Sequence, residues 1–138
     1  MTTPDDAGPL DLDPDGLAVR RAVLGPTHVD AALARADATT AAFQELITRY
    51  AWGGIWTRPG LDRRMRSAIT LTALVAHGHL GELELHLRGA LRNGLSREEI
   101  VEVLLQCAIY SGVPAANAAF GVARRVLADD DPGTGPQG

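Results

Sequence analysis

The segment HGHLGELELHLR, residues 77–88, holds the densest group of side chains that can exchange protons. Glu82 and His86 are four residues apart, so they share one face if this segment is a helix. A carboxylate beside an imidazole orients the ring, fixes its tautomer and supports its charge, as proton transfer requires. Glu84 points to another side of the same helix and is expected to pair with Arg88.

Three interpretations of Glu82 and His86 remain open at this point. The first is a solvated pair within one helix, which contributes only a few tenths of a kcal/mol. The second is a metal site, because His77 and His79 could add ligands, although their spacing matches no tight metal-binding signature. The third is a proton-transfer pair. Position alone does not choose among them.

A second cluster, RYAWGGIWTRPGLDRRMR, spans residues 49–66 and combines both tryptophans with five arginines around a glycine-bearing break. One interpretation is a packed loop with surface arginines, which is the usual place for arginine. The other is an anion pocket, in which guanidinium groups bind carboxylates and indole rings exclude water. The absence of lysine favours the pocket. The predicted substrate-binding residues are Arg58, Arg63, Arg66, Trp52 and Trp56, together with Tyr110 from a later helix.

The composition excludes several classes of chemistry. All thirteen cationic side chains are arginine, so no lysine can form a Schiff base or anchor pyridoxal phosphate. The single cysteine, Cys107, excludes an internal disulfide and is expected to be buried and inert. A net charge of −4 argues against nucleic acid as a partner. No apolar run is long enough to cross a membrane, and the acidic N-terminus lacks the pattern of a signal peptide, which predicts a cytoplasmic protein.

The 138 residues are enough for one domain. Residues 1–16 and 129–138 are rich in Asp, Pro and Gly and are predicted to be disordered, which leaves a helical domain over residues 17–128. No alternating run of β-branched residues indicates a strand, so the predicted fold is all-α, with five or six helices. Thin, alanine-rich helices often bury their remaining apolar faces against another subunit, so a homo-oligomer is expected.

The predicted helices follow from periodicity and from the residues that begin and end helices. They cover residues 17–24, 28–50, 62–76 and 82–92, then a helix that opens at Ser96, and a last stretch over 114–127. Ser96 and Glu99 form the pattern of a capping box, and Asn93-Gly94 is a good C-terminal stop for the preceding helix. Tyr110 is expected on the buried stripe of the helix that opens at Ser96.

Several segments together resemble the carboxymuconolactone decarboxylase family. They are VRRAVLGPTHVD, FQELITRYAWGGIWTRPGL, ELHLRGALRNGLSREEI and QCAIYSGVPAANAAF, and the resemblance extends from Val19 to Leu127. It implies an all-α subunit of the alkylhydroperoxidase-like type and a ring-shaped oligomer, usually a hexamer. It also implies an enzyme without a cofactor in the protocatechuate branch of the β-ketoadipate pathway. Peroxidase relatives carry two cysteines where this chain has His79 and Glu82, so disulfide-based peroxide reduction is not expected.

The implied substrate, γ-carboxymuconolactone, carries two carboxylates and its own electron sink. When carbon dioxide leaves, the electron pair can pass through the ring double bond to the lactone carbonyl, so no cofactor is needed. Our hypothesis for this chemistry is that His86 is the proton donor or the oxyanion donor, with Glu82 as its orienting partner. The product would be β-ketoadipate enol-lactone. The alternatives are a related cofactor-free lactone decarboxylase or isomerase, and a non-catalytic helical oligomer that binds a small acid.

Overall fold

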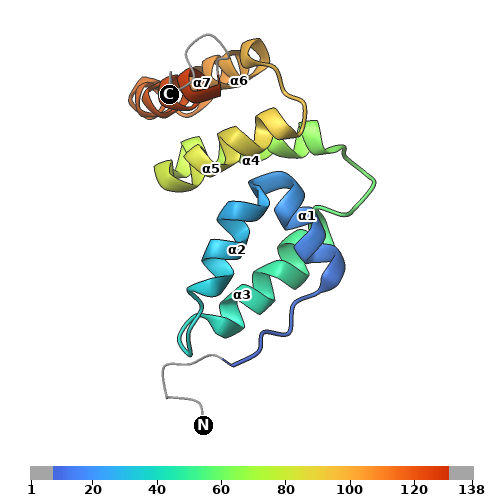
Figure 1. Ribbon diagram of the computed structural model, residues 1–138. Coiled ribbons are helices and arrows are strands. Elements are labelled where there is room, and N and C mark those ends of the chain that lie inside the picture. The colour runs from blue at the N-terminus through green and yellow to red at the C-terminus, as the bar shows by residue number, and fades with distance from the viewer. Residues whose placement is uncertain (1–7, 131–138) are drawn as a thin grey trace. The chain divides into compact units, whose positions relative to one another are not determined.

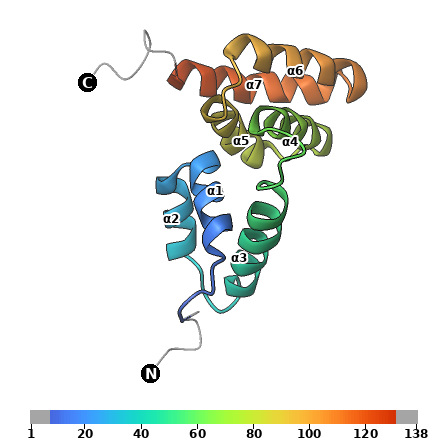
Figure 2. The same cartoon turned by 90° about the vertical axis from the view of Figure 1, so that its right-hand side faces the viewer.

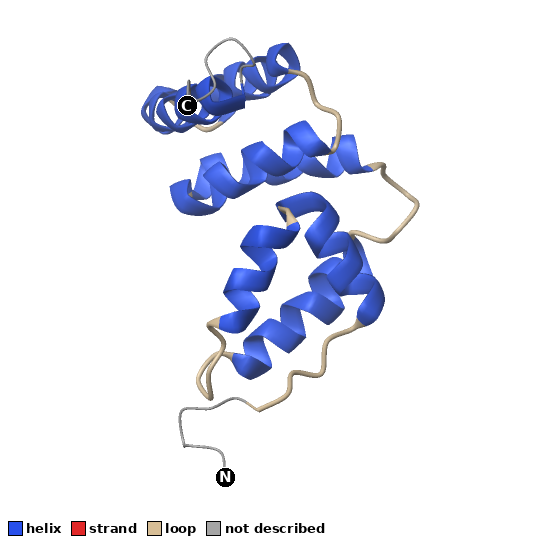
Figure 3. Ribbon diagram, in the orientation of Figure 1, coloured by secondary structure: helices blue, strands red, loops and turns tan. Residues whose placement is uncertain are grey.

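The computed structural model describes residues 8–130, and within them the regular elements are helical (Figure 3). They are α1 (Pro14–Leu24), α2 (Pro26–Ala34), α3 (Ala41–Ile47), the π-helix η1 (Thr48–Ile55), α4 (Arg63–His77), α5 (Leu80–Arg92), α6 (Arg97–Tyr110) and α7 (Val113–Asp130). The all-α prediction is confirmed, with seven α-helices in the described residues rather than five or six. The chain forms two compact units, the first ending at Leu61 and the second beginning at Asp62.

In the first unit, α1 packs closely against η1, and at Gly16 the two segments approach each other main chain to main chain. The Asp13 carboxylate caps α1 by accepting a hydrogen bond of 2.8 Å from the backbone N–H of Gly16. A Cβ atom on Gly16 would collide with the carbonyl oxygen of Thr48, so only glycine fits there. The buried Arg20 guanidinium donates to Gln44 Oε1 at 2.9 Å and to Thr48 Oγ1 at 3.3 Å. The contact between α1 and η1 therefore depends on a glycine and on a buried polar group.

The prediction of a single helix over residues 28–50 is wrong, because the chain turns between α2 and α3. The Asp37 carboxylate accepts hydrogen bonds from the backbone N–H groups of Thr39 and Thr40, at 2.9 and 3.1 Å. An aspartate that bonds the backbone two and three residues ahead offers it an alternative to helix. The Gly53-Gly54 pair, predicted to break the helix, instead lies inside η1.

The second unit contains α4, α5, α6 and α7, and Figures 1 and 2 both show α6 and α7 side by side. Its core is aliphatic and comes from all four helices. The fully buried large side chains are Leu71 and Val75 of α4, Leu83 and Leu87 of α5, Ile100, Leu104 and Cys107 of α6, and Val126 of α7. The prediction that Cys107 is buried is thus confirmed.

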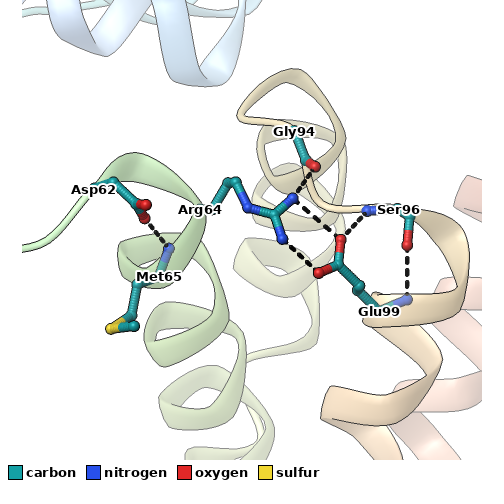
Figure 4. A network of polar contacts seen from close by, with 6 residues as sticks. All are labelled: Asp62, Arg64, Met65, Gly94, Ser96 and Glu99. Carbon is teal, nitrogen blue, oxygen red and sulfur yellow. Dashed lines mark hydrogen bonds and ion pairs between the residues drawn. The ribbon is translucent and has the colours of Figure 1, made fainter.

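A polar network joins the start of α4 to the connection between α5 and α6 (Figure 4). The Arg64 guanidinium forms an ion pair with the Glu99 carboxylate and donates to the carbonyl oxygen of Gly94. Glu99 also accepts from the backbone N–H of Ser96 at 2.9 Å, while Ser96 Oγ accepts from the Glu99 N–H at 3.0 Å. This reciprocal pair is the predicted capping box of α6, which is confirmed.

The ends of the helical region differ from the sequence prediction. Helix α1 begins at Pro14, inside the segment 1–16 that was predicted to be disordered, and α7 continues to Asp130, two residues into the predicted tail. Asp13 caps α1, which explains the early start. Residues 8–13 precede α1 without regular secondary structure, and residues 1–7 and 131–138 of the two predicted segments lie outside the described residues. Between residues 8 and 130, no helix combines the length and apolarity needed to cross a membrane. The cytoplasmic location stays a prediction.

The Arg64–Glu99 pair predicts how stability depends on pH. Hydrogen bonds from Arg64 and Ser96 lower the pKa of Glu99 from its ordinary 4.5 to about 2. Because the pKa is lower in the folded state, Glu99 stabilises the fold above about pH 4.5 and loses this contribution as the pH falls towards 2. In urea titrations, Glu99→Gln is therefore expected to reduce the free energy of unfolding at neutral pH, and this deficit should shrink towards pH 2. Glu98→Gln, at an exposed neighbouring position, is the control, and a deficit that stays constant with pH would contradict the prediction.

Candidate functional site

Helix α5 sets the positions of Glu82 and His86. Its apolar face is fixed by Leu83 and Leu87, which are completely buried in the core of the second unit. Glu82 and His86 each precede one of these leucines by one position, so they lie together at the edge of the buried face. Glu82 is exposed, whereas His86 is half-buried. The core thus presents an imidazole at the boundary of the apolar interior, with a carboxylate one turn away.

Partial burial and the nearby Glu82 carboxylate both affect the pKa of His86. Partial burial lowers the pKa of the His86 imidazole below its ordinary 6.5, because a charged ring loses hydration there. The Glu82 carboxylate raises the same pKa, and its effect is the smaller of the two. An imidazole with a lowered pKa releases its proton readily, which suits a proton donor. The opposing effect of Glu82 indicates that the two side chains interact, as their spacing predicted.

The turn between α4 and α5 brings two further imidazoles together. Gly78 ends α4 in the left-handed conformation, with φ of 71°, and His79 is the N-cap residue of α5. The rings of His77 and His79 stack with their centroids 5.9 Å apart and an angle of 23° between their planes. Both residues are exposed. Since Glu82 is three residues after His79, the N-cap and the carboxylate lie on the same side of the first turn of α5.

The metal-site interpretation required three or more of these groups to converge on one point. Among residues 8–130, no group of three or more His, Cys, Asp or Glu side chains is placed to hold a metal ion. The stacked pair His77 and His79 therefore has no third ligand within the described part of the chain. The predicted pairing of Glu84 with Arg88 is present, at 3.4 Å.

Two of the predicted substrate-binding arginines belong to the second unit. Arg63 is exposed at the first position of α4, and Arg66 is half-buried three residues later on the same face. A third arginine of this segment, Arg64, is engaged in the ion pair with Glu99 (Figure 4). Arg63 and Arg66 are the two arginines of α4 that the sequence predicted as ligands of a carboxylate. Their role stays a prediction.

The remaining aromatic and cationic residues of the second sequence cluster belong to the first unit. The Trp52 and Trp56 rings stack with centroids 5.1 Å apart and an angle of 23° between their planes. Trp52 is buried and Trp56 is half-buried, so the pair has one packed ring and one partly accessible ring. Trp52 lies in η1 and Trp56 is the residue that ends it, and π-helical segments occur frequently at functional sites. Arg58 follows η1 and is exposed. Substrate binding by these three residues stays a prediction.

Tyr110 does not lie where the sequence placed it. The ring was expected on the buried stripe of α6, but 81% of it is exposed at the last position of the helix. The buried stripe of α6 ends at Cys107, one turn before the helix itself ends at Tyr110. A hollow of about 330 Å³ in the second unit is lined by Arg88, Leu91, Arg92 and Asp130, and none of these is a predicted site residue.

Comparison with known proteins adds an independent line of information. Residues 41–125 match the family model described as "Carboxymuconolactone decarboxylase family". The chain is 44% identical over 114 residues to 4-carboxymuconolactone decarboxylase of Acinetobacter baylyi, covering 83% of this chain and 85% of the relative. It is also 44% identical over 115 residues to nitrosuccinic acid decarboxylase of Metarhizium robertsii, covering 83% and 80% respectively. A shorter match to 4-carboxymuconolactone decarboxylase of Pseudomonas putida is 53% identical over 38 residues, covering 28% and 79%.

The interaction between Glu82 and His86 can be measured directly by NMR titration of the histidine ring resonances. His86 is expected to titrate below 6.5, and Glu82→Gln should lower its pKa further, because the carboxylate that favours the charged ring is lost. Glu84→Gln, which alters a carboxylate paired with Arg88 instead, is the matched control and should leave the titration of His86 unchanged. A rise or no change in the Glu82→Gln protein would show that the two groups do not interact.

Proposed function

Because the chain belongs to the carboxymuconolactone decarboxylase family, we propose that it decarboxylates γ-carboxymuconolactone to β-ketoadipate enol-lactone without a cofactor. The observation that carries the proposal is 44% identity to a 4-carboxymuconolactone decarboxylase over 83% of this chain. The pair formed by Glu82 and His86 supports it, because this decarboxylation needs one proton donor.

The substrate supplies the electron sink and the protein supplies the proton. Loss of carbon dioxide breaks the bond between the γ carbon and its carboxylate. The electron pair of that bond moves through the ring double bond to the carbonyl oxygen of the lactone. His86, in its protonated form, then transfers a proton to the α carbon of the dienolate and becomes neutral. Glu82 orients the imidazole and stabilises its charged form before the transfer. One carbon dioxide leaves, and one proton is consumed in each turnover.

Within the second unit, Arg63 and Arg66 are the proposed ligands of the substrate carboxylates. A guanidinium remains charged even when it is partly buried, so the half-buried Arg66 can hold an anion away from bulk water. A dianionic substrate near His86 would also favour the protonated ring, which opposes the effect of burial on its pKa. Binding of the substrate thus favours protonation of His86 before the proton is transferred.

A second candidate substrate is nitrosuccinate, because a nitrosuccinic acid decarboxylase matches this chain with the same 44% identity over 83% of its length. The two substrates have the same arrangement of functional groups around the carbon that loses its carboxylate. In each, the leaving carboxylate sits on a carbon that also bears a CH₂–carboxylate arm and is joined to an electron acceptor. The acceptor is the unsaturated lactone in one and the nitro group in the other. The same carboxylate ligands and the same proton donor would therefore serve both reactions.

The assay follows the ultraviolet absorbance of the lactone and the release of carbon dioxide, with nitrosuccinate tested in parallel. We expect turnover of γ-carboxymuconolactone, and a loss of about 10²- to 10⁴-fold in kcat/KM for His86→Ala, as for removal of a general acid. Glu84→Gln, on another side of α5, should keep wild-type kinetics. Turnover of nitrosuccinate alone would assign the second substrate. Ligand-induced stabilisation without carbon dioxide release would instead indicate a non-catalytic binding protein.

We also propose that the protein assembles into a homo-oligomer, with a hexamer as the expected state. An apolar patch at the C-terminal end of α6 and the start of α7 supports this proposal. Ile109, Tyr110 and Val113 are 78%, 81% and 70% exposed in the single chain, and Leu105 lies one turn before Ile109. Large exposed apolar patches typically mark interaction surfaces.

Sedimentation tests the assembly. The wild-type protein is expected at six times the subunit mass of 14.6 kDa. The double variant Leu105→Glu/Ile109→Glu should sediment as a smaller species, because it places charges on the patch. Arg125→Glu, at an exposed position of α7 outside the patch, is the control for a change of charge. A wild-type monomer would refute the proposal, and an unaltered double variant would show that the patch is not the interface.

A further inference from the structure

The proposed decarboxylation leaves His86 without its proton after every turnover, so the proton must be replaced from solvent. His86 is half-buried, and the neighbouring core side chains Leu83 and Leu87 are closed to water. The groups beside it on the same helix face are better placed to meet solvent. Glu82 is exposed one turn earlier, and His79 is exposed at the N-cap.

These groups follow one another along the start of α5. Glu82 and His86 are four residues apart within the helix, a spacing that places side chains on the same face, and the N-cap His79 precedes Glu82 by three residues. His77 extends the series at its outer end, because its ring stacks on that of His79 at 5.9 Å between centroids. The series therefore runs from two exposed imidazoles, through one carboxylate, to a half-buried imidazole.

We propose that His77 and His79 collect protons from solvent and return them through Glu82 to His86 after each turnover. The inference rests on the proposed function. In the relay step, an N–H bond of the His79 imidazolium breaks and one Glu82 carboxylate oxygen takes the proton. The carboxyl group then gives a proton to the neutral His86 ring, and His79 is recharged from water or from His77. No electrons are exchanged, and one proton enters for each one delivered to the product.

Imidazole suits the outer end of such a relay for a chemical reason. It is the side chain that gains and loses protons readily near neutral pH, whereas an isolated carboxylate collects them only in acid. Glu82 alone would therefore be a poor collector even though it is exposed. At the inner end of the series, Glu82 lies one helical turn from His86, and its charge raises the pKa of that ring.

The relay makes a kinetic prediction that a purely structural role would not make. Reprotonation follows the irreversible loss of carbon dioxide, so impairing it lowers kcat and leaves kcat/KM unchanged. For His77→Gln/His79→Gln, we expect kcat in dilute, non-nitrogenous buffer at about pH 8 to fall by about tenfold, the lower range of proton-transfer effects. Added imidazole should restore kcat towards the wild-type value, because its protonated form can diffuse in and donate the proton that the missing rings no longer supply. The wild-type enzyme should not respond to imidazole.

His28→Gln, in α2, is the matched control, because it removes the remaining histidine that lies outside this series. The single variant His79→Gln tests the inner ring of the pair should the double variant fold poorly. Unchanged kcat in dilute buffer would overturn the relay, and so would a fall in kcat/KM that imidazole does not reverse, since that result assigns the rings to substrate binding. If the wild-type enzyme releases no carbon dioxide from either substrate, the proposed function fails and the relay fails with it. If only the relay is refuted, the wild-type enzyme still releases carbon dioxide and the double variant keeps the wild-type kcat.

Discussion

The rotation of α5 about its own axis is the constraint on which the candidate site depends. Leu83 and Leu87 are completely buried, so the helix cannot turn without exposing them. Burying a leucine side chain contributes about 1.5–3 kcal/mol, which makes any other rotation costly. Because Glu82 and His86 precede these leucines by one position, the same packing that closes the core places the proton-transfer pair at its edge. Stability and chemistry therefore share one helix.

Partial burial gives His86 properties that an exposed imidazole would not have. Desolvation makes the charged ring less stable, so its proton is released more readily. Glu82 offsets part of this effect and keeps the charged form accessible. A bound dianion would act in the same direction as Glu82. Under the proposed function, His86 would therefore be protonated most fully when substrate is bound, which would couple binding to the proton-transfer step.

The sequence was most informative where local chemistry decides structure. The capping box of Ser96 and Glu99, the stop at Asn93-Gly94 and the pair formed by Glu84 and Arg88 all depend on residues within four positions of one another, and all are present. Proximity of Glu82 and His86 was predictable for the same reason. The all-α class followed from periodicity, and the family followed from motifs spread over most of the chain.

The errors arose where contacts distant in sequence, or special local bonds, overrule periodicity. The apolar spacing of residues 28–50 continued through Asp37, whose side chain nevertheless bonds the backbone and turns the chain. Gly53 was taken as a helix breaker, but it lies in η1 beside the Asp13 carboxylate, a partner forty residues away. Tyr110 has the spacing of a core residue at the end of α6, yet 81% of it is exposed. Burial of His86 also depends on packing that periodicity alone does not reveal.

The close approach of α1 to η1 has a consequence for how this scaffold can diversify. Because Gly16 meets the carbonyl oxygen of Thr48, the two segments touch main chain to main chain at this point, where no Cβ atom can be accommodated. Side chains on the outer face of η1, such as the exposed Tyr50 and Ile55, can therefore be exchanged without moving the segment that carries the tryptophans. Descendants of this protein would be free to vary that outer surface, while residue 16 would be held invariant.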